Sequence, residues 1–226
     1  MGELQGPALY QFDDASFRPE DFESIQRVGD GLKRGDPTKT GQFGIGFNSC
    51  YHVTDMPMFL SGKYAVFFDP HMKYLPTLRG GGTGSFLDMK TPMEAAAASG
   101  AGPGSASSLS GCLYGDKYAD QFAPFVGMFG ASAKGVWGDP AAWDHTAGTP
   151  SAADVASMKG AEGTLFRFPL RTRAAAVSSD IKRNSRYTTL EQHVVDVENE
   201  VLRPFLRGMQ QKLLFLKSVE VIEVYV

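Results

Sequence analysis

The sequence predicts one domain in which helices and strands mix, in the α/β or α+β class. Of its 226 residues, 42% are hydrophobic and 21% are charged, which is typical of a globular protein with a sizeable core. Segments with strand-like alternation and segments with helical periodicity follow one another along the chain. No apolar run approaches eighteen residues and residues 1–10 lack the features of a signal peptide, so we expect no membrane partner.

Charge and cysteine content indicate which partners and which cellular compartment to expect. The formal net charge is −3, so no basic field attracts nucleic acid or an anionic membrane. The densest basic cluster, Arg171 to Arg186, is interrupted by Ala, Ser and Asp, and we interpret it as a solvated surface. The two cysteines, Cys50 and Cys112, form neither a metal-ligand pattern nor a disulfide framework, which favours a reducing compartment and a cytoplasmic location.

The first third of the chain contains a predicted strand, a turn and a helix. Residues 7–12 have strand character, and Asp13 to Ser16 turn the chain. A helix then begins at Ser16 or at Arg18-Pro19 and runs to Ile25, with acidic residues in its first turn as the helix dipole prefers. Residues 29–40 are polar and are expected to be mobile.

A glycine loop follows, and it is the most informative motif of the sequence. Gly41, Gly44 and Gly46 fall within six residues, and an apolar segment of helical character, roughly 45–54, comes next. Glycines let the backbone approach a ligand closely, and the first N–H groups of a helix attract anions. The motif therefore predicts a phosphate-binding loop. The alternative is a tight turn that packs a helix on a sheet.

The middle of the chain alternates between ordered and low-complexity sequence. Residues 63–69 read as a strand that ends at Asp69-Pro70, and the glycine-rich residues 79–85 as a flexible loop. Two Ala/Gly-rich stretches, at about 91–111 and 131–161, are predicted to be insertions.

The last third returns to regular elements. Residues 163–170 alternate as in a strand, and residues 219–226 suggest a closing strand. Residues 188–207 predict a helix whose end is disturbed by Pro204, and 212–217 are a short apolar piece. The apolar face of that helix consists of Leu190, Val194, Val197, Val201 and Leu202.

Two related resemblances extend this picture. Residues 41–55 resemble the loop and helix that close the ATP lid in the ninety-kilodalton heat-shock chaperones, which are GHKL ATPases with the Bergerat fold. The wider sequence resembles sacsin-type domains, in blocks that keep their order along almost the whole chain. These blocks are residues 4–10, 41–57, 68–71, 120–125, 163–171 and 214–219.

The resemblance implies a more specific fold. It predicts an α+β Bergerat-type two-layer sandwich with a mostly antiparallel sheet, formed by residues 1–226 as one partial domain that lacks its first helix and strand. In the family that helix carries a Glu that activates water and an Asn that helps to hold Mg²⁺. Glu3 is the only acid before the first strand, and its context differs. We therefore predict no catalytic residue and no metal ligand, and ATP hydrolysis is left open.

The resemblance also implies a nucleotide site. The loop would wrap the phosphates of ATP or ADP, accompanied by Mg²⁺ if the upstream helix is supplied, and residues 29–40 would form the lid. The phosphate-binding residues are Gly41, Gln42, Phe43, Gly44, Ile45, Gly46 and Phe47.

The base of the nucleotide would be read at the other end of the site. Asp13 or Asp14 matches an Asp that accepts from the adenine amino group, and Thr164 matches a Thr that assists directly or through water. Ala15 and Ser16 stand where the superfamily has glycines, so the choice between the two acids stays open. The alternative for either acid is an Asx turn or a helix cap.

Two functions of different classes follow. The first is an ATP-binding, chaperone-related domain that acts in protein folding or quality control, with client proteins or co-chaperones as partners. The second is a nucleotide-independent interaction module, either a degenerate sacsin-like domain or a truncated fragment, whose sheet flank another chain completes. For His52 and His71 the sequence favours packing or surface roles over general-base chemistry.

Overall fold

The computed structural model describes residues 6–25, 46–62, 64–74, 83–88, 161–181, 190–214, 216 and 219–224. Several predictions fall outside these residues. They are the loop residues Gly41 to Ile45, the lid at 29–40, the insertion at 91–111, all but residue 161 of the insertion at 131–161, and Cys112.

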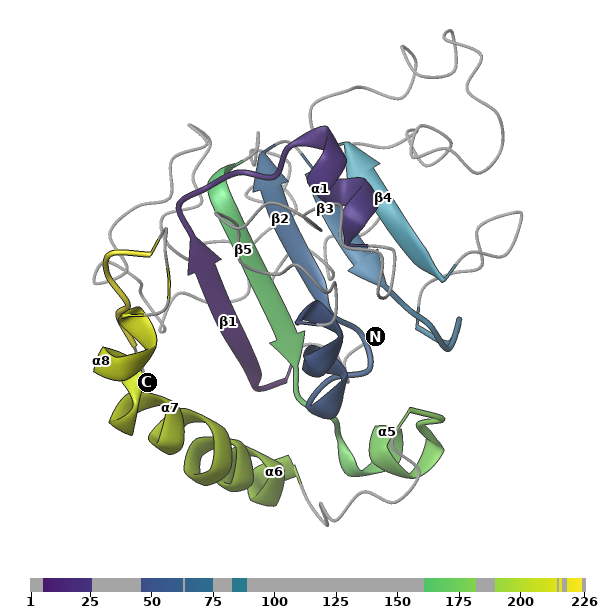
Figure 1. Ribbon diagram of the computed structural model, residues 1–226. Coiled ribbons are helices and arrows are strands. Elements are labelled where there is room, and N and C mark those ends of the chain that lie inside the picture. Colours follow the sequence, from purple (N-terminus) through teal and green to yellow (C-terminus); the bar gives the residue numbers. More distant parts are fainter. Residues whose placement is uncertain are drawn as a thin grey trace, which may run out of the picture.

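The described strands form one antiparallel sheet, in the order β1-β5-β2-β3-β4 (Figure 1). Each neighbouring pair is antiparallel, and helices accompany the sheet, so the predicted α+β class is confirmed. The strands are β1 (Ala8–Asp13), β2 (Met58–Gly62), β3 (Tyr64–Phe68), β4 (Gly84–Asp88) and β5 (Ala161–Pro169).

Strand β2 was not predicted, although it lies in the middle of the sheet. The strand predicted at 63–69 corresponds to β3, and no element was predicted for residues 58–62. Met58, Phe59 and Leu60 are 2%, 0% and 0% exposed. Because β2 is buried on both faces, it lacks the apolar–polar alternation that marks a half-exposed strand.

Strand β4 corrects the prediction of a flexible loop at 79–85, because Gly84 and Ser85 belong to it. Gly84 lies opposite Phe68 in the register of β3 and β4. A Cβ at Gly84 would lie 2.8 Å from the Phe67 carbonyl oxygen. This glycine therefore permits the close approach of two strands. The glycine-rich composition of residues 79–85 alone does not distinguish this role from that of a loop residue.

Two short helices lie on one face of the sheet. Helix α1 (Pro19–Ser24) begins at Pro19, one of the two predicted starts, and the Arg18 amide donates to the Asp21 carboxylate at 3.0 Å. The element after the glycine loop is the 3₁₀-helix η2 (Phe47–His52), within the predicted range 45–54. Phe22 of α1 packs on Phe59, and Phe47 of η2 packs on Phe166, the cross-strand partner of Phe59.

The remaining helices follow β5. Helix α5 (Arg173–Ser178) was not predicted; it is capped by the Thr172 hydroxyl, which accepts from the Ala175 amide at 3.1 Å. The predicted helix at 188–207 is confirmed from Leu190, where the described residues begin, to Arg207, and α8 (Met209–Leu213) continues it into the start of the short apolar piece at 212–217 (Figure 1). Its parts are α6 (Leu190–Val197), the π-helical turn η7 (Glu198–Leu202), α7 (Arg203–Arg207) and α8 (Met209–Leu213).

The closing strand predicted at 219–226 is wrong for its described part. Residues 219–224 have no regular secondary structure, and Val221 is 71% exposed. Alternation of Val and Ile with Glu marks a strand only where a partner strand supplies hydrogen bonds, and among the described residues the sheet places none beside this segment.

Candidate functional site

The two ends of the predicted base-binding region lie next to each other. Asp13 is the last residue of β1, and its cross-strand partner in β5 is Thr164. Asp14 follows in the turn, and both acids are exposed. Thr164 is buried, at 1% exposure. Residues far apart in sequence thus converge on one corner of the sheet.

A network of hydroxyl groups holds this corner together. The Thr164 hydroxyl donates to the Ala15 carbonyl at 2.8 Å and lies 2.8 Å from the Ser61 hydroxyl. Ser61, in β2, also accepts from the Phe17 amide at 2.8 Å. Both hydroxyl groups therefore bind the backbone of the turn that carries Asp13 and Asp14. Ser61 was not among the predicted site residues; the signal for it was a polar residue inside an otherwise apolar strand.

Asp13 makes a local contact of its own. Its Oδ1 accepts from the Ala15 amide at 2.9 Å, which forms an Asx turn. This is the structural role that the sequence left open as the alternative to an adenine contact. The carboxylate keeps further acceptor capacity toward solvent, so the turn and a contact with a base are compatible.

Gly163 makes the turn and β5 fit against each other. Its φ is +93°, and a Cβ there would lie 2.5 Å from the Asp13 carbonyl oxygen. The Ser16 hydroxyl accepts from its amide at 3.0 Å. A glycine is required both for the backbone conformation and for the space.

The described end of the predicted phosphate loop consists of Gly46 and Phe47. Gly46 precedes η2 with a helical φ of −59°, and its carbonyl accepts from the Ser49 hydroxyl at 2.7 Å. The Phe47 ring lies 5.3 Å from Phe68 and 6.1 Å from Phe166. Its side chain therefore attaches η2 to the sheet, and only its backbone is left for the predicted phosphate contact.

Aromatic rings fill the layer between α1 and the sheet. Phe17, which follows the turn, lies 5.0 Å from Phe59 and 6.0 Å from Phe166. Phe22 of α1 lies 5.3 Å from Phe17 and 6.0 Å from Phe59. This packing fixes the base-binding corner and η2 to the same rigid surface.

Arg171 anchors the other end of η2, which corrects its assignment to a solvated basic cluster. The residue is 3% exposed and follows β5 after Leu170. Its Nε donates to Asp55 at 2.6 Å, and its two terminal nitrogens donate to the carbonyls of Tyr51, His52 and Thr54. Carbonyls at a helix C-terminus lack partners within the helix, so a buried cation satisfies them. Composition gave no sign of this, because a guanidinium is buried only where acceptors surround it.

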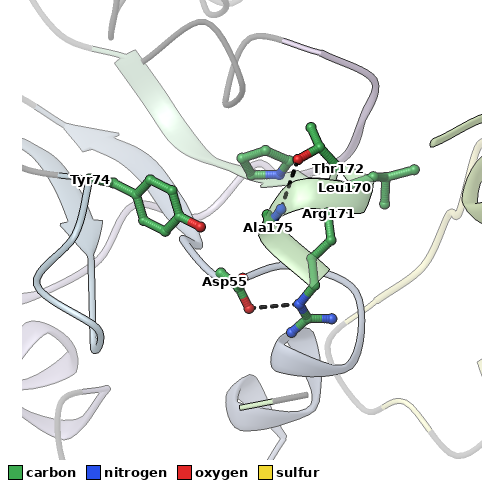
Figure 2. Close-up of a pocket in the computed structure, with 7 residues that line it drawn as sticks. Asp55, Tyr74, Leu170, Arg171, Thr172 and Ala175 are labelled. Carbon is green, nitrogen blue, oxygen red and sulfur yellow. Dashed lines mark hydrogen bonds and ion pairs between the residues drawn. The ribbon is translucent and has the colours of Figure 1, made fainter. Parts of the chain in front are cut away.

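A small hollow adjoins this ion pair (Figure 2). Tyr74, Leu170, Thr172 and Ala175 line it together with the pair itself. Its volume is about 10 Å³, close to the minimum that one water molecule requires. The hollow is therefore far too small for a nucleotide, and it lies beside the anchor, away from the base-binding corner.

Several titratable side chains near η2 are buried. Burial raises the pKa of the Cys50 thiol to about 12 and is also the main cause that raises the pKa of Tyr51 to about 12. The buried His71 ring lies 3.4 Å from Asp180 and 3.9 Å from Asp55. His52 is exposed. In the described ranges, no group of three or more His, Cys, Asp or Glu side chains is placed to hold a metal ion.

Among the helices that the structure describes, none is long and apolar enough to cross a membrane.

Two comparisons with known proteins agree with the resemblance seen in the sequence. The family model of the sacsin domain matches residues 1–100. The whole chain is 32% identical to human sacsin over 226 residues, and it spans about 4% of the length of that relative. The matched first part contains β1, the turn at Asp13, the glycine loop and η2. The chain is thus similar to a sacsin domain in its first hundred residues and to a segment of human sacsin along its full length.

Proposed function

We propose that this chain is a sacsin-type domain that binds ATP or ADP and acts in protein folding or quality control, in the cytoplasm. The observation that supports the proposal best is the convergence of three predicted parts on one face of the sheet. Asp13 and Thr164 are cross-strand partners there, and η2 brings Gly46 and Phe47 onto the same face. The Bergerat type of the fold and the chaperone role rest on the resemblance.

Each part has a proposed task. A carboxylate at the turn, from Asp13 or Asp14, accepts from the adenine amino group. Thr164 donates to Ala15, so its own proton holds the turn, and it would take part in the site as an acceptor toward a water or the base. The backbone amides of the loop and of the first turn of η2 donate to phosphate oxygens. The proposal concerns binding, since the resemblance assigns the general base and the Mg²⁺ ligand to a helix upstream of β1.

Gly46 offers a direct test, because the described structure does not itself need a glycine there. Its φ is helical, and a Cβ at this position would meet no atom within 4 Å. If the glycine serves the close approach of a phosphate, Gly46→Val weakens Mg-ATP binding at least tenfold while the melting temperature stays within about 2 °C. Calorimetric titration with Mg-ATP and Mg-ADP measures this, with Val177→Ala, at an exposed position of α5 away from the loop, as the control. Equal affinity in Gly46→Val and wild type would contradict the loop assignment.

A second candidate function, a nucleotide-independent interaction module, is favoured by a different observation. The groups expected to face the base already have partners within the chain: Asp13 accepts from Ala15, and Thr164 donates to Ala15. β1 is an edge strand of the described sheet, which suits pairing with another chain. An absence of heat at millimolar Mg-ATP and Mg-ADP would support this candidate and contradict the first.

A further inference from the structure

We propose that Arg171 is the positioning residue of the nucleotide site, which it serves by clamping the C-terminal end of η2 so that Gly46 and Phe47 keep a fixed place over the sheet. This inference rests on the proposed function for its nucleotide part. Its structural part stands on the geometry of Arg171 alone.

The clamp is a set of bonds from one guanidinium to three carbonyls at the end of η2 and just beyond it. Arg171 donates to His52 and Thr54 at 2.9 Å each, and also to Tyr51. The backbone amide of Arg171 donates to the Val53 carbonyl at 3.3 Å. The end of η2 and the two residues that follow it are therefore held by the side chain and the backbone amide of one residue, which lies just after β5.

The guanidinium is itself fixed by other elements. Asp55 accepts from its Nε at 2.6 Å and from the Ser179 hydroxyl, after α5, at 2.8 Å. The Arg171 carbonyl lies 3.2 Å from Nδ1 of the buried His193 in α6. The planar fork of an arginine can make all these bonds at once, whereas a lysine ammonium in the same place cannot.

Other attachments of η2 also lie in the described residues. Phe47 packs on Phe68 and Phe166 at its start, and Cys50 is buried in its middle. A six-residue 3₁₀-helix is not stable by itself, because a short helix has few internal hydrogen bonds. The anchors at its two ends therefore contribute to its position, and Arg171 supplies a polar anchor at the C-terminal end.

Cys50 provides a reporter inside η2. Its thiol is 8% exposed, and burial raises its pKa to about 12, so it reacts slowly with a thiol reagent at pH 8 while η2 stays in place. The experiment uses the full chain with Cys112→Ser as background, so that Cys50 is the only thiol. Labelling rates at pH 8 are compared with the free energy of unfolding from urea denaturation.

Arg171→Lys keeps the charge beside Asp55 and removes the fork. We expect the labelling rate of Cys50 in this variant to exceed, at least tenfold, the rate that global unfolding of the variant would give. The reason is that η2 then opens locally. Phe67→Leu, in the buried sheet, is the control for a global loss of stability, and Arg207→Lys, exposed on α7, is the control for the substitution type. Labelling in Arg171→Lys that follows global unfolding as in Phe67→Leu would overturn the clamp.

Asp55→Asn removes the ion pair and leaves the clamp. It is also the variant to use if Arg171→Lys does not fold. Its amide oxygen still accepts from Arg171, so the bonds to the three carbonyls remain. We expect labelling within threefold of the rate that its stability accounts for. An increase as large as in Arg171→Lys, or a tenfold increase where only Asp55→Asn folds, would show that the ion pair and not the carbonyl clamp holds η2.

Titration with Mg-ATP tests the functional part. We expect the Kd to rise about tenfold in Arg171→Lys and to stay unchanged in Arg207→Lys. An unchanged Kd together with fast Cys50 labelling would overturn the positioning role while leaving nucleotide binding intact. No binding by the wild type would overturn the proposed function, and Cys50 labelling would still decide whether Arg171 holds η2.

Discussion

Gly163 lies where β5 begins to pair with the end of β1, and it has a φ of +93°. A Cβ there would approach the Asp13 carbonyl oxygen to 2.5 Å and the Phe12 ring to 2.8 Å. The ring can move, but the carbonyl belongs to the ladder between the two strands. At this residue, both the backbone conformation and the packing require a glycine.

We predict that Gly163→Ala lowers the free energy of unfolding by about 2–4 kcal/mol, because conformational strain adds to a clash with backbone. Gly62→Ala is the matched control. Gly62 has a φ of +55° but open space around it, so we expect a loss of about 1 kcal/mol. Urea denaturation measures both. Equal losses in the two variants would mean that the strand can shift to accept the added methyl group.

At the scale of elements, the helix formed by α6, η7 and α7 shows how one residue changes a geometry. The Arg203 amide donates to the Glu198 carbonyl, five residues back, which makes η7 a π-helical turn. Pro204 follows directly; it has no N–H, and its ring would collide with the carbonyl four residues back in a regular helix. The wider turn removes that collision. It also shifts the phase of the helix, so that Val201, predicted on the apolar face with Val197, is 44% exposed whereas Val197 is 3% exposed.

We predict that Pro204→Ala converts this turn to regular α-helix and stabilises the segment by about 1–2 kcal/mol, since an interior proline costs about 3 kcal/mol in a helix and part of this is already relieved. Hydrogen exchange of the amides from Leu202 to Gly208 measures the change. Pro19→Ala is the control, because a proline in the first turn of α1 removes only an amide that has no helical partner. Slower exchange in neither variant would exclude Pro204 as the cause of the π turn.

At the scale of the whole molecule, burial around η2 links stability to pH. The pKa of Cys50 rises from 9.0 to about 12 and that of Tyr51 from 10.0 to about 12 on folding. The folded chain therefore binds more protons than the unfolded chain between pH 9 and 12. Stability from this source is complete below pH 9 and is lost as the pH rises toward 12.

We predict that the free energy of unfolding falls between pH 8.5 and 10.5 because the unfolded chain ionises first. Urea denaturation across this range measures the slope, which we expect to be smaller in Cys50→Ala and in Tyr51→Phe than in the wild type. Tyr10→Phe is a control for the substitution itself. The hydroxyl of Tyr10 accepts a hydrogen bond from Arg167. The same slope in Cys50→Ala as in the wild type would mean that the thiol is not buried in solution.

Much of the fold follows from local sequence. The β1 and β5 strands, the start of α1 at Pro19 and the helix over 190–207 were all predictable, because turn residues, acidic first turns and apolar spacing act over a few neighbouring residues. Ser61 and β2 were not predictable in this way. A strand buried on both faces lacks the alternation of apolar and polar residues. The role of the Ser61 hydroxyl is visible only from its contact with Thr164 on the next strand.

The sequence by itself determined that helices and strands mix, the glycine loop before η2 and the similarity to sacsin, since these depend on residue types in order. Tertiary structure alone decided which groups meet. It placed Thr164 beside Asp13, left the 219–224 segment outside the sheet, and buried Arg171, whose neighbours in sequence suggested a solvated surface. The physical reason is that a guanidinium leaves water only where several acceptors converge, and the carbonyls that end η2 reach Arg171 only after the chain has folded.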